Sequence, residues 1–441
     1  MPSYEHPPQL NNFAIVDVLC STSLRILSVS YKRFELRFRF TRNRRHDPTS
    51  CPLMNIRPNS TTLPLLTFYA VRVYIDFKKA FDSIDHRLLL FKLSQLGVSH
   101  QLIEWLRSYL SNRMQSVVIN GVRSQPLHVV SGVPQGSSIG PLLFIVFIND
   151  VSTVISQNVQ YGVYADDLKL YASSGNFADM QQSLDKISEW SASNNMNISE
   201  TKCSVQYFVH ANPRNPYYIN GVQLSSQNVV KDLGILMTNN LNFSEYITKA
   251  CAKTASIINM MFRAFRSTNP IIYVKAYVVY ARPLIEYCTE LWNPTAVGLV
   301  NEIESIQRSF TNRVFMRCGI PYETYLNRLE TLNLTTLEHR RAVRDFSFIQ
   351  GALMAKYALD HTSSFILAPI NRALRGQHFL RITLPFTIQS AHSTVATRTI
   401  GIFNYLPQDI VDLPPSHLSQ CNFSTLKNNA TTLVKLAIID H

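Results

Sequence analysis

The order of apolar and polar positions divides the chain into a first part that contains strands and a second part that is helical. Residues 68–75 are β-branched and aromatic, which predicts a buried strand. Similar short runs recur up to about residue 240, with helical stretches between them. The pattern predicts strands at 68–75, 117–120, 205–209 and 229–236, and two short strands within 161–172 with acids at the turn between them. Helices are predicted at 86–95, 101–110, 141–149 and 179–194.

After residue 242 the strand pattern fades, and apolar residues repeat with the helical period of 3.6 residues. Helices are predicted at 245–266, 273–287, 300–317 and 337–354. We therefore expect an irregular basic segment at 1–65, an α+β domain at 66–240, a helical region at 241–330 and a mixed C-terminal region at 331–441. Seven basic residues between Lys32 and Arg45 fit either an RNA-binding or nuclear-import stretch or an unstructured segment.

Composition narrows the class of protein. Hydrophobic residues make up 46% of the 441 residues and charged residues 16%, which excludes a disordered chain. The formal net charge is 42 − 29 = +13. This excess of positive charge fits a polyanionic partner, and it fits a globular protein that is simply basic equally well. Seven scattered cysteines without a Cys-x-x-Cys pair argue against a disulfide framework and a cysteine zinc site. Without a secretory pattern or a membrane-spanning apolar run, we expect an intracellular, soluble protein with no membrane partner.

Two acidic clusters stand where a predicted strand meets a turn. Asp76 closes the first strand, and Asp166 and Asp167 form a pair between two later strands. Neighbouring carboxylates repel each other, and a divalent cation removes that repulsion. A third carboxylate from an adjacent strand would complete two metal sites about 3.5–4 Å apart, suited to in-line phosphoryl transfer. Each cluster alone is weak evidence for a metal site, because an Asp-Asp pair in a turn is usually a solvated tip.

The order of these acids, and the Gly-Val-Pro-Gln-Gly string between them, resembles the reverse transcriptases of non-LTR (LINE-type) retrotransposons. The likeness covers roughly residues 70–430, is strongest over 73–240, and continues downstream into segments similar to jockey-like elements. Residues 73–93 resemble motif A of this family, residues 131–144 with 148–150 motif B, and residues 164–167 with 170–171 motif C. Residues 197–203 resemble motif D and residues 231–234 motif E. The segments similar to jockey-like elements are 282–287, 292–294, 303–310 and 404–409.

The resemblance implies a polymerase palm of the split β-α-β type at 66–240, followed by a mostly helical thumb and C-terminal region. It implies that Asp76, Asp166 and Asp167 bind two Mg²⁺ ions, for which Mn²⁺ is a possible substitute, with the backbone carbonyl of Phe77 as a further ligand. The partners it implies are an RNA template, a DNA primer and deoxynucleoside triphosphates. We expect the carboxylates of Asp76 and Asp166 to converge, although 166 − 76 = 90 positions separate them.

Further roles follow from the resemblance around the nucleotide. Phe81 would lie against the sugar and exclude a ribose 2′-hydroxyl, while Gln135 and Gly136 would line the nucleotide and template. Lys202 would act as the acid for the leaving pyrophosphate. Apart from the resemblance, Phe81 fits ordinary core packing, Gln135 and Gly136 fit a Gly/Pro turn, and Lys202 fits a surface lysine.

A basic helix face is the last expected feature. Lys249, Lys253, Arg263 and Arg266 would lie beside the duplex backbone on the thumb helix, where they also fit an ordinary solvated face.

The sequence departs from the family before motif A. The fingers motifs that supply basic residues to the incoming triphosphate are not recognisable in residues 1–70, so the chain resembles a copy truncated at its N-terminus. One alternative is therefore an inactive relic that keeps nucleic-acid binding, and another is a structural interaction protein whose acids are surface turns. Retrotransposon biology places such a protein in the nucleus and cytoplasm.

Overall fold

The computed structural model describes residues 70–208 and 212–353, together with 366–368, 381–383, 395 and 398–399. The described residues form two compact units, one ending at Val230 and the other beginning at Lys231. The expected basic segment at 1–65, most of the expected mixed region after residue 353, and the late motif at 404–409 lie outside the described residues.

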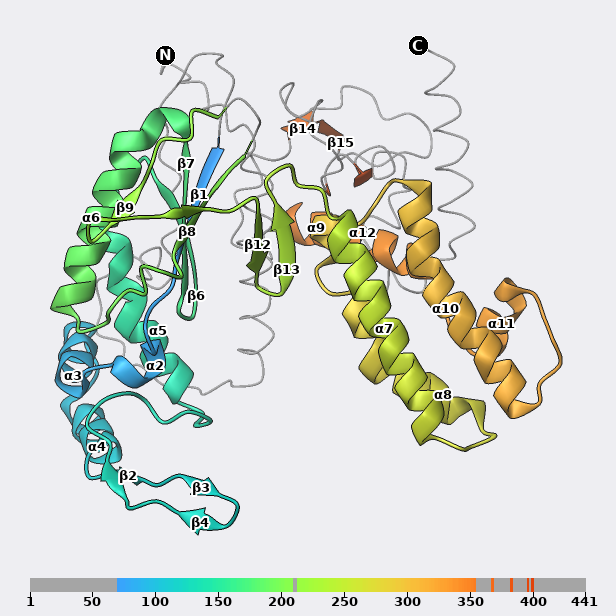
Figure 1. The fold of residues 1–441 in the computed structure, drawn as a ribbon, viewed down its shortest axis with the longest axis horizontal. Coiled ribbons are helices and arrows are strands. Elements are labelled where there is room, and N and C mark those ends of the chain that lie inside the picture. The colour runs from blue at the N-terminus through green and yellow to red at the C-terminus, as the bar shows by residue number, and fades with distance from the viewer. Residues whose placement is uncertain are drawn as a thin grey trace. The chain divides into compact units, whose positions relative to one another are not determined.

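A five-stranded sheet forms the centre of the first unit, with strand order β11-β8-β1-β7-β6 (Figure 1). Strand β1 is central and pairs antiparallel with both β7 and β8, so Val73 lies opposite Leu170 on one side and Val205 on the other. All three side chains are buried, which explains why residues 68–75 read as a continuous apolar strand. The strands are β1 (Ala70–Ile75), β6 (Gln160–Tyr164), β7 (Asp167–Ser173), β8 (Ser204–Tyr207) and β11 (Ser225–Ser226).

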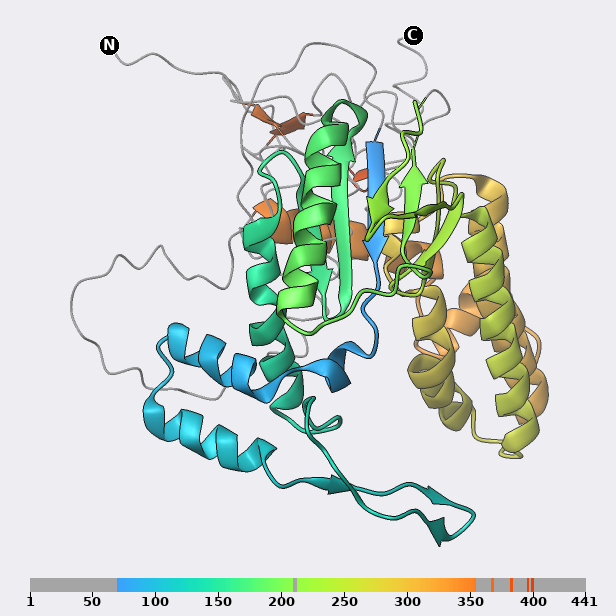
Figure 2. The same cartoon turned by 60° about the vertical axis from the view of Figure 1, so that its left-hand side comes forward.

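Helices pack on this sheet through apolar stripes. In α6 (Phe177–Ser193), Met180, Leu184 and Ile187 recur at helical spacing and are fully buried, and Figure 2 shows the helix lying along one face of the sheet. Helix α5 (Gly140–Ile148) is apolar on every side, as expected for a buried helix. The other helices are α2 (Ala80–Ser83), α3 (His86–Gln95) and α4 (His100–Leu110), with a 3₁₀ helix at Asn149–Val154 and another at Ser174–Asn176.

A two-stranded ribbon projects from this unit between α4 and α5 (Figure 2). Its Asn120-Gly121 turn has positive φ at both residues, the geometry that this dipeptide predicts for a tight hairpin. The apolar side chains along it, including Val118, Ile119 and Val122, are exposed. The ribbon consists of β2 (Met114–Gln115), β3 (Val118–Ile119), β4 (Val122–Arg123) and β5 (Leu127–His128), and a shorter hairpin pairs β9 (Tyr218–Ile219) with β10 (Val222–Gln223).

One predicted strand is two strands. The sequence predicts a single strand at 229–236, whereas β12 (Val229–Asp232) and β13 (Ile235–Thr238) pair with each other across a turn. Leu233 and Gly234 both have positive φ at this turn. The prediction was wrong because Leu233 is apolar and rarely adopts that backbone conformation, so the apolar run hides the reversal.

The second unit is mainly helical. Tyr277 stacks on Phe310 with ring centroids 4.2 Å apart, and Phe262 stacks on Tyr273 at 4.8 Å, which joins α7, α8 and α10 through one aromatic core. Figure 1 shows α7 and α10 side by side. The elements are α7 (Ser244–Ala264), α8 (Pro270–Ala276), α9 (Thr289–Trp292), α10 (Val297–Cys318), α11 (Tyr325–Thr331) and α12 (Leu337–Leu353), with strands β14 (Ile366–Ala368) and β15 (Arg381–Thr383).

The helix predicted at 273–287 is interrupted. It begins as α8, widens into a π-helix at Tyr277–Ala281 and ends as a 3₁₀ turn at Arg282–Ile285. Pro283 has no backbone N–H to donate and its ring clashes with the preceding turn, so a regular α-helix cannot continue through it. In the part of the chain that the structure describes, no helix is long and apolar enough to cross a membrane.

Candidate active site

The acids of the two clusters lie at the same end of the strands β1, β6 and β7. The last pair of β1 with β7 is Ile75 opposite Leu168, and Tyr164 pairs with Asp167 across the β6–β7 turn. Continuing the antiparallel register by one residue sets Asp76 opposite Asp167, with Asp166 beside it in the turn. Strand pairing therefore places at the same end of the strands acids that are 166 − 76 = 90 positions apart in the chain, and the convergence of their carboxylates stays a prediction.

These side chains do not form a ready-made metal site. Among the described residues, no three Asp, Glu, His or Cys side chains stand close enough together to hold a metal ion. One oxygen of Asp76, Oδ1, is nevertheless buried and accepts no hydrogen bond. The nearest cation is Nζ of Lys202, 3.7 Å from that oxygen. A buried carboxylate oxygen without a donor is unfavourable, so this position suits an additional cation, and carboxylate oxygens are the ligands that hard divalent ions prefer.

The backbone after Asp76 is held by the segment that precedes β8. The Ser199 N–H donates to the Asp76 carbonyl over 2.7 Å, and the Lys78 N–H donates to the Asn197 carbonyl over 2.7 Å. Phe77 faces Ile198 across this bridge without exchanging hydrogen bonds with it. In such a pair the residue's own N–H and C=O point to the opposite side, which here is the side of β7. The Phe77 carbonyl thus points to the side on which β7 lies, and its role as a metal ligand stays a prediction.

The side chain of Cys203 contacts the backbone of Asp76, a contact that sequence reasoning missed. Its Sγ accepts a hydrogen bond from the backbone N–H of Asp76 over 3.4 Å, and the side chain is buried. Burial raises the pKa of the Cys203 thiol to about 11. The only sequence signal was its place immediately after Lys202 in the segment that resembles motif D.

The thiol of Cys203 is expected to resist alkylation. At pH 8 it stays protonated because its raised pKa of about 11 lies well above the solution pH, and the thiolate is the reactive form. Iodoacetamide labelling of the native protein followed by peptide mass spectrometry should modify Cys318, which is partly exposed, before Cys203. In urea both should react alike, and early modification of native Cys203 would contradict the packing described here.

Of the two lysines near Asp76, Lys78 pairs with Glu200 and Lys202 lies beside Asp76. Glu200 accepts hydrogen bonds from Asn220 over 2.9 Å and from Nζ of Lys78 over 3.1 Å. These donors, with the Asn220 amide first, lower the pKa of Glu200 to about 2. Lys78 is therefore engaged by Glu200, while the exposed Lys202 remains the cation beside Asp76.

The loop that resembles motif B is fastened to α2 and to the residues that follow it. The Gly132 N–H donates to Ile84 and the Val133 N–H to Phe81, over 2.8 and 3.0 Å. Nε2 of His86 donates to the Gly132 carbonyl over 2.7 Å. Gly132 has φ +86°, and a Cβ there would lie 2.8–2.9 Å from backbone atoms of Phe81 and Asp82. The close approach of the two segments therefore requires glycine at this position.

The predicted nucleotide-lining residues differ in their surroundings. Phe81 is half-buried and stacks on Phe144 at 4.2 Å, so its ring is fixed by the core. The side-chain amide of Gln135 donates to Oδ1 of Asp82 over 2.9 Å. Asp82 is a second residue that sequence reasoning missed. Gly136 has φ +79° with open space around its Cα, so its backbone can be approached closely.

The basic face predicted on the thumb helix is only partly continuous. Lys249 is paired with Glu245 over 2.6 Å, whereas Lys253 and Arg263 are exposed on α7. Arg266 is exposed but follows the end of the helix at Ala264. An open groove of about 530 Å³ next to Arg263 is lined by small side chains of α7 and by Arg313 of α10. The groove residues are Ala252, Ala255, Ser256, Asn259, Arg263 and Arg313.

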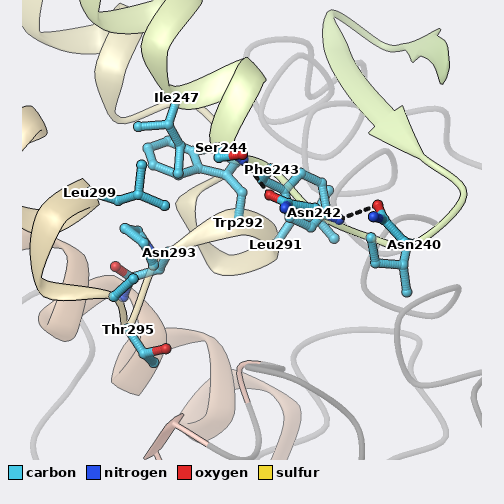
Figure 3. Close-up of a pocket in the computed structure, with 13 residues that line it drawn as sticks. Asn240, Asn242, Phe243, Ser244, Ile247, Leu291, Trp292, Asn293, Thr295 and Leu299 are labelled. Atoms are coloured by element: carbon cyan, nitrogen blue, oxygen red, sulfur yellow. Dashed lines mark hydrogen bonds between the residues drawn. The ribbon is translucent and has the colours of Figure 1, made fainter.

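The Trp292-Asn293-Pro294 segment is structural. Trp292 donates from its indole to the Tyr287 carbonyl over 2.7 Å, and Asn293 bridges Arg341 and Asp345 of α12. The segment lines a pocket of about 400 Å³ at the start of α7 (Figure 3). The contacts of Asn293 therefore join this segment to α12 within the second unit.

Comparison with known proteins shows which families this chain is similar to. Residues 21–237 match the family described as "Reverse transcriptase (RNA-dependent DNA polymerase)". The RNA-directed DNA polymerase from mobile element jockey of Drosophila funebris is 29% identical over 260 residues, which is 56% of this chain and 28% of that protein. The probable RNA-directed DNA polymerase from transposon X-element of Drosophila melanogaster is 24% identical over 250 residues, 54% of this chain and 27% of that protein.

The chain thus spans less than a third of the length of these relatives. Among solved structures, telomerase from Candida albicans in complex with a fragment of telomeric RNA aligns with a TM-score of 0.34 and 14% identity, covering 61% of this chain and 50% of that one.

Proposed function

Since residues 21–237 match the reverse transcriptase family and the chain is similar to RNA-directed DNA polymerases of mobile elements, we propose that this chain is an RNA-directed DNA polymerase of the non-LTR retrotransposon type. It adds deoxynucleotides to the 3′ end of a DNA primer along an RNA template. The observation that carries the proposal is the register of β1, β6 and β7, which sets Asp76 beside the Asp166–Asp167 turn.

Asp76 and Asp166 would hold two Mg²⁺ ions, with Asp167 and the Phe77 carbonyl contributing at the same edge. Bound there, the ions would activate the primer 3′-hydroxyl and neutralise the triphosphate. Oδ1 of Asp76 supports this assignment because it is buried, accepts no hydrogen bond and has only Nζ of Lys202 in ion-pair contact, at 3.7 Å.

The protein's own side chains would position the substrates and move protons. Lys202, exposed and 3.7 Å from Asp76, can donate a proton to the departing pyrophosphate. Phe81, fixed against Phe144, would restrict the sugar, and Gln135, held by Asp82, would contact the base or template strand.

Extension of a labelled DNA primer annealed to RNA tests the proposal. The chain should lengthen the primer in the presence of Mg²⁺ or Mn²⁺ and all four deoxynucleotides, and stop after one addition when only the first complementary nucleotide is given. No extension at any concentration of either ion, together with retained binding of the primed template, would instead support a relic that only binds nucleic acid.

Basic residues of α7 should contribute to binding through electrostatics. Lys253→Gln and Arg263→Gln each remove one exposed charge, so each should lower the slope of log K against log[salt] by roughly 0.7–0.9. Fluorescence anisotropy with a primed template at several salt concentrations measures this slope. Arg87→Gln, at a side chain 91% exposed on α3, is the matched control. Slopes equal to that of the control would show that this face does not contact the phosphate backbone.

A further inference from the structure

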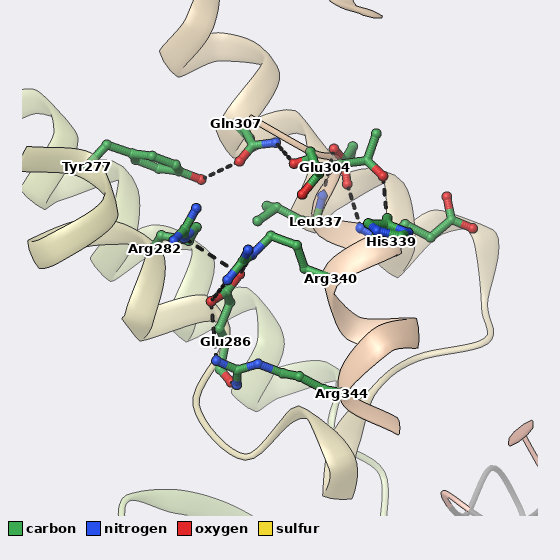
Figure 4. Close-up of polar contacts among 12 residues, drawn as sticks. Tyr277, Arg282, Glu286, Glu304, Gln307, Leu337, His339, Arg340 and Arg344 are labelled. Carbon is green, nitrogen blue, oxygen red and sulfur yellow. Dashed lines mark hydrogen bonds and ion pairs between the residues drawn. The ribbon is translucent and has the colours of Figure 1, made fainter. Parts of the chain in front are cut away.

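Glu286 lies at the centre of three arginines that the polymerase proposal leaves unexplained (Figure 4). Arg340 donates from Nε and Nη2 to its carboxylate, with the Nη2 contact at 3.2 Å, and Arg344 contacts Oε2 at 3.3 Å. Arg344 also donates to the Glu286 backbone carbonyl. Nε of Arg282, one helical turn before Glu286, is 3.8 Å from Oε1. The carboxylate is almost completely buried.

The charges in this cluster do not balance. Within the described residues, Glu286 is the only acid in ion-pair contact with the three arginines, which leaves a local charge of +3 − 1 = +2. Arg340 and Arg344 are four residues apart on α12, where like charges repel. Burial, and then repulsion from Arg340, lowers the pKa of Arg282. A second anion would relieve this repulsion.

The three arginines also have N–H groups that Glu286 alone cannot satisfy as an acceptor. Nε of Arg282 is buried and donates no hydrogen bond. Each guanidinium carries five N–H donors, and one carboxylate cannot accept from three of them fully. The side chains of Arg340 and Arg344 remain 29% and 36% exposed, so the cluster can be reached from solvent.

We propose that Arg282, Arg340 and Arg344 bind a phosphate group, next to Glu286, which neutralises one of their three charges. Planar guanidinium groups match phosphate oxygens through paired hydrogen bonds, and a doubly positive cluster favours a group with negative charge. The phosphate belongs either to a nucleic-acid backbone or to free pyrophosphate, and both present the same oxygens.

Isothermal titration of the full chain with inorganic phosphate tests the site. Arg344→Gln should weaken binding about tenfold because it removes one charged contact. Glu286→Gln should strengthen binding, since it raises the local charge to +3, whereas a purely structural ion-pair cluster would only lose stability. Arg308→Gln, an exposed change on α10, is the control. Equal phosphate affinity in the wild type, Arg344→Gln and Arg308→Gln, or no binding to the wild type, would overturn the proposal.

A second pair of titrations separates the sources. Weaker binding of a short single-stranded RNA by Arg344→Gln, with a shallower salt dependence, assigns the site to a nucleic-acid backbone. Unchanged RNA binding with weaker pyrophosphate binding assigns it to the free anion. The RNA titration rests on the proposed polymerase function, whereas the phosphate titration does not. Phosphate binding without primer extension would therefore count against the polymerase alone.

Discussion

Asp166→Asn is expected to reduce primer extension at least about a thousandfold, equivalent to roughly 4 kcal/mol of transition-state stabilisation. The substitution keeps the size of the side chain and removes the charge that a divalent ion would need at the β6–β7 turn. Primer binding should stay within about threefold of the wild type, because the turn is at the edge of the sheet and no core contact changes. Single-turnover extension with saturating nucleotide measures the chemical step directly.

Asp185→Asn provides the matched control for this experiment. Asp185 is exposed on α6 and accepts a hydrogen bond from Gln181 over 2.9 Å, away from the acids at the sheet edge. Its extension rate should equal that of the wild type. An Asp166→Asn protein that retains more than a tenth of the wild-type rate would mean that the predicted metal ligand is misassigned.

Gly132→Ala should strongly destabilise the loop that resembles motif B. A Cβ at this position would lie 2.8 Å from the Asp82 Cα and 2.9 Å from the carbonyl oxygens of Phe81 and Asp82. These are backbone atoms and cannot rotate away, and φ of +86° is itself strained for alanine. We expect a loss of about 3 kcal/mol in unfolding free energy, measured by urea denaturation.

Gly136→Ala separates backbone strain from collision. Gly136 is in the same loop with φ +79°, but a Cβ there would meet nothing within 4 Å. It should cost only about 1 kcal/mol, the strain of the backbone conformation alone. Similar losses for the two variants would show that the loop does not press against α2. Primer extension should fall more in Gly132→Ala, since displacement of the loop also moves Gln135.

Local signals predicted much of the first unit. The bounds of α3 agree with the helix predicted at 86–95. An aspartate just before a helix is a common cap, and Asp85 accepts hydrogen bonds from the Arg87 and Leu88 N–H groups over 2.8 and 3.2 Å. The Asn120-Gly121 hairpin is likewise encoded in two residues. Such features depend on chemistry within a few positions, so a single sequence contains them.

Features that depend on distant partners could not be predicted in the same way. The ends of strands indicated where the acids lie along the chain, and the family motifs suggested which acids meet, but only the register of β1 with β7 sets Asp76 opposite Asp167. The Cys203 contact to Asp76 spans 203 − 76 = 127 positions. The positive φ of Leu233 is set by its turn and leaves no trace in the apolar pattern around it.

The ribbon between α4 and α5 is expected to be the first part of the first unit to unfold locally. Its hydrogen bonds are open to solvent on both faces, and none of the side chains of β3 and β4 is buried. Stability within a fold is uneven, and such segments exchange their amide protons long before a central strand does. Deuterium should therefore enter residues 114–128 first, while β1 stays protected. Proteolytic cleavage or shortening of the ribbon should therefore leave the sheet that carries Asp76 folded.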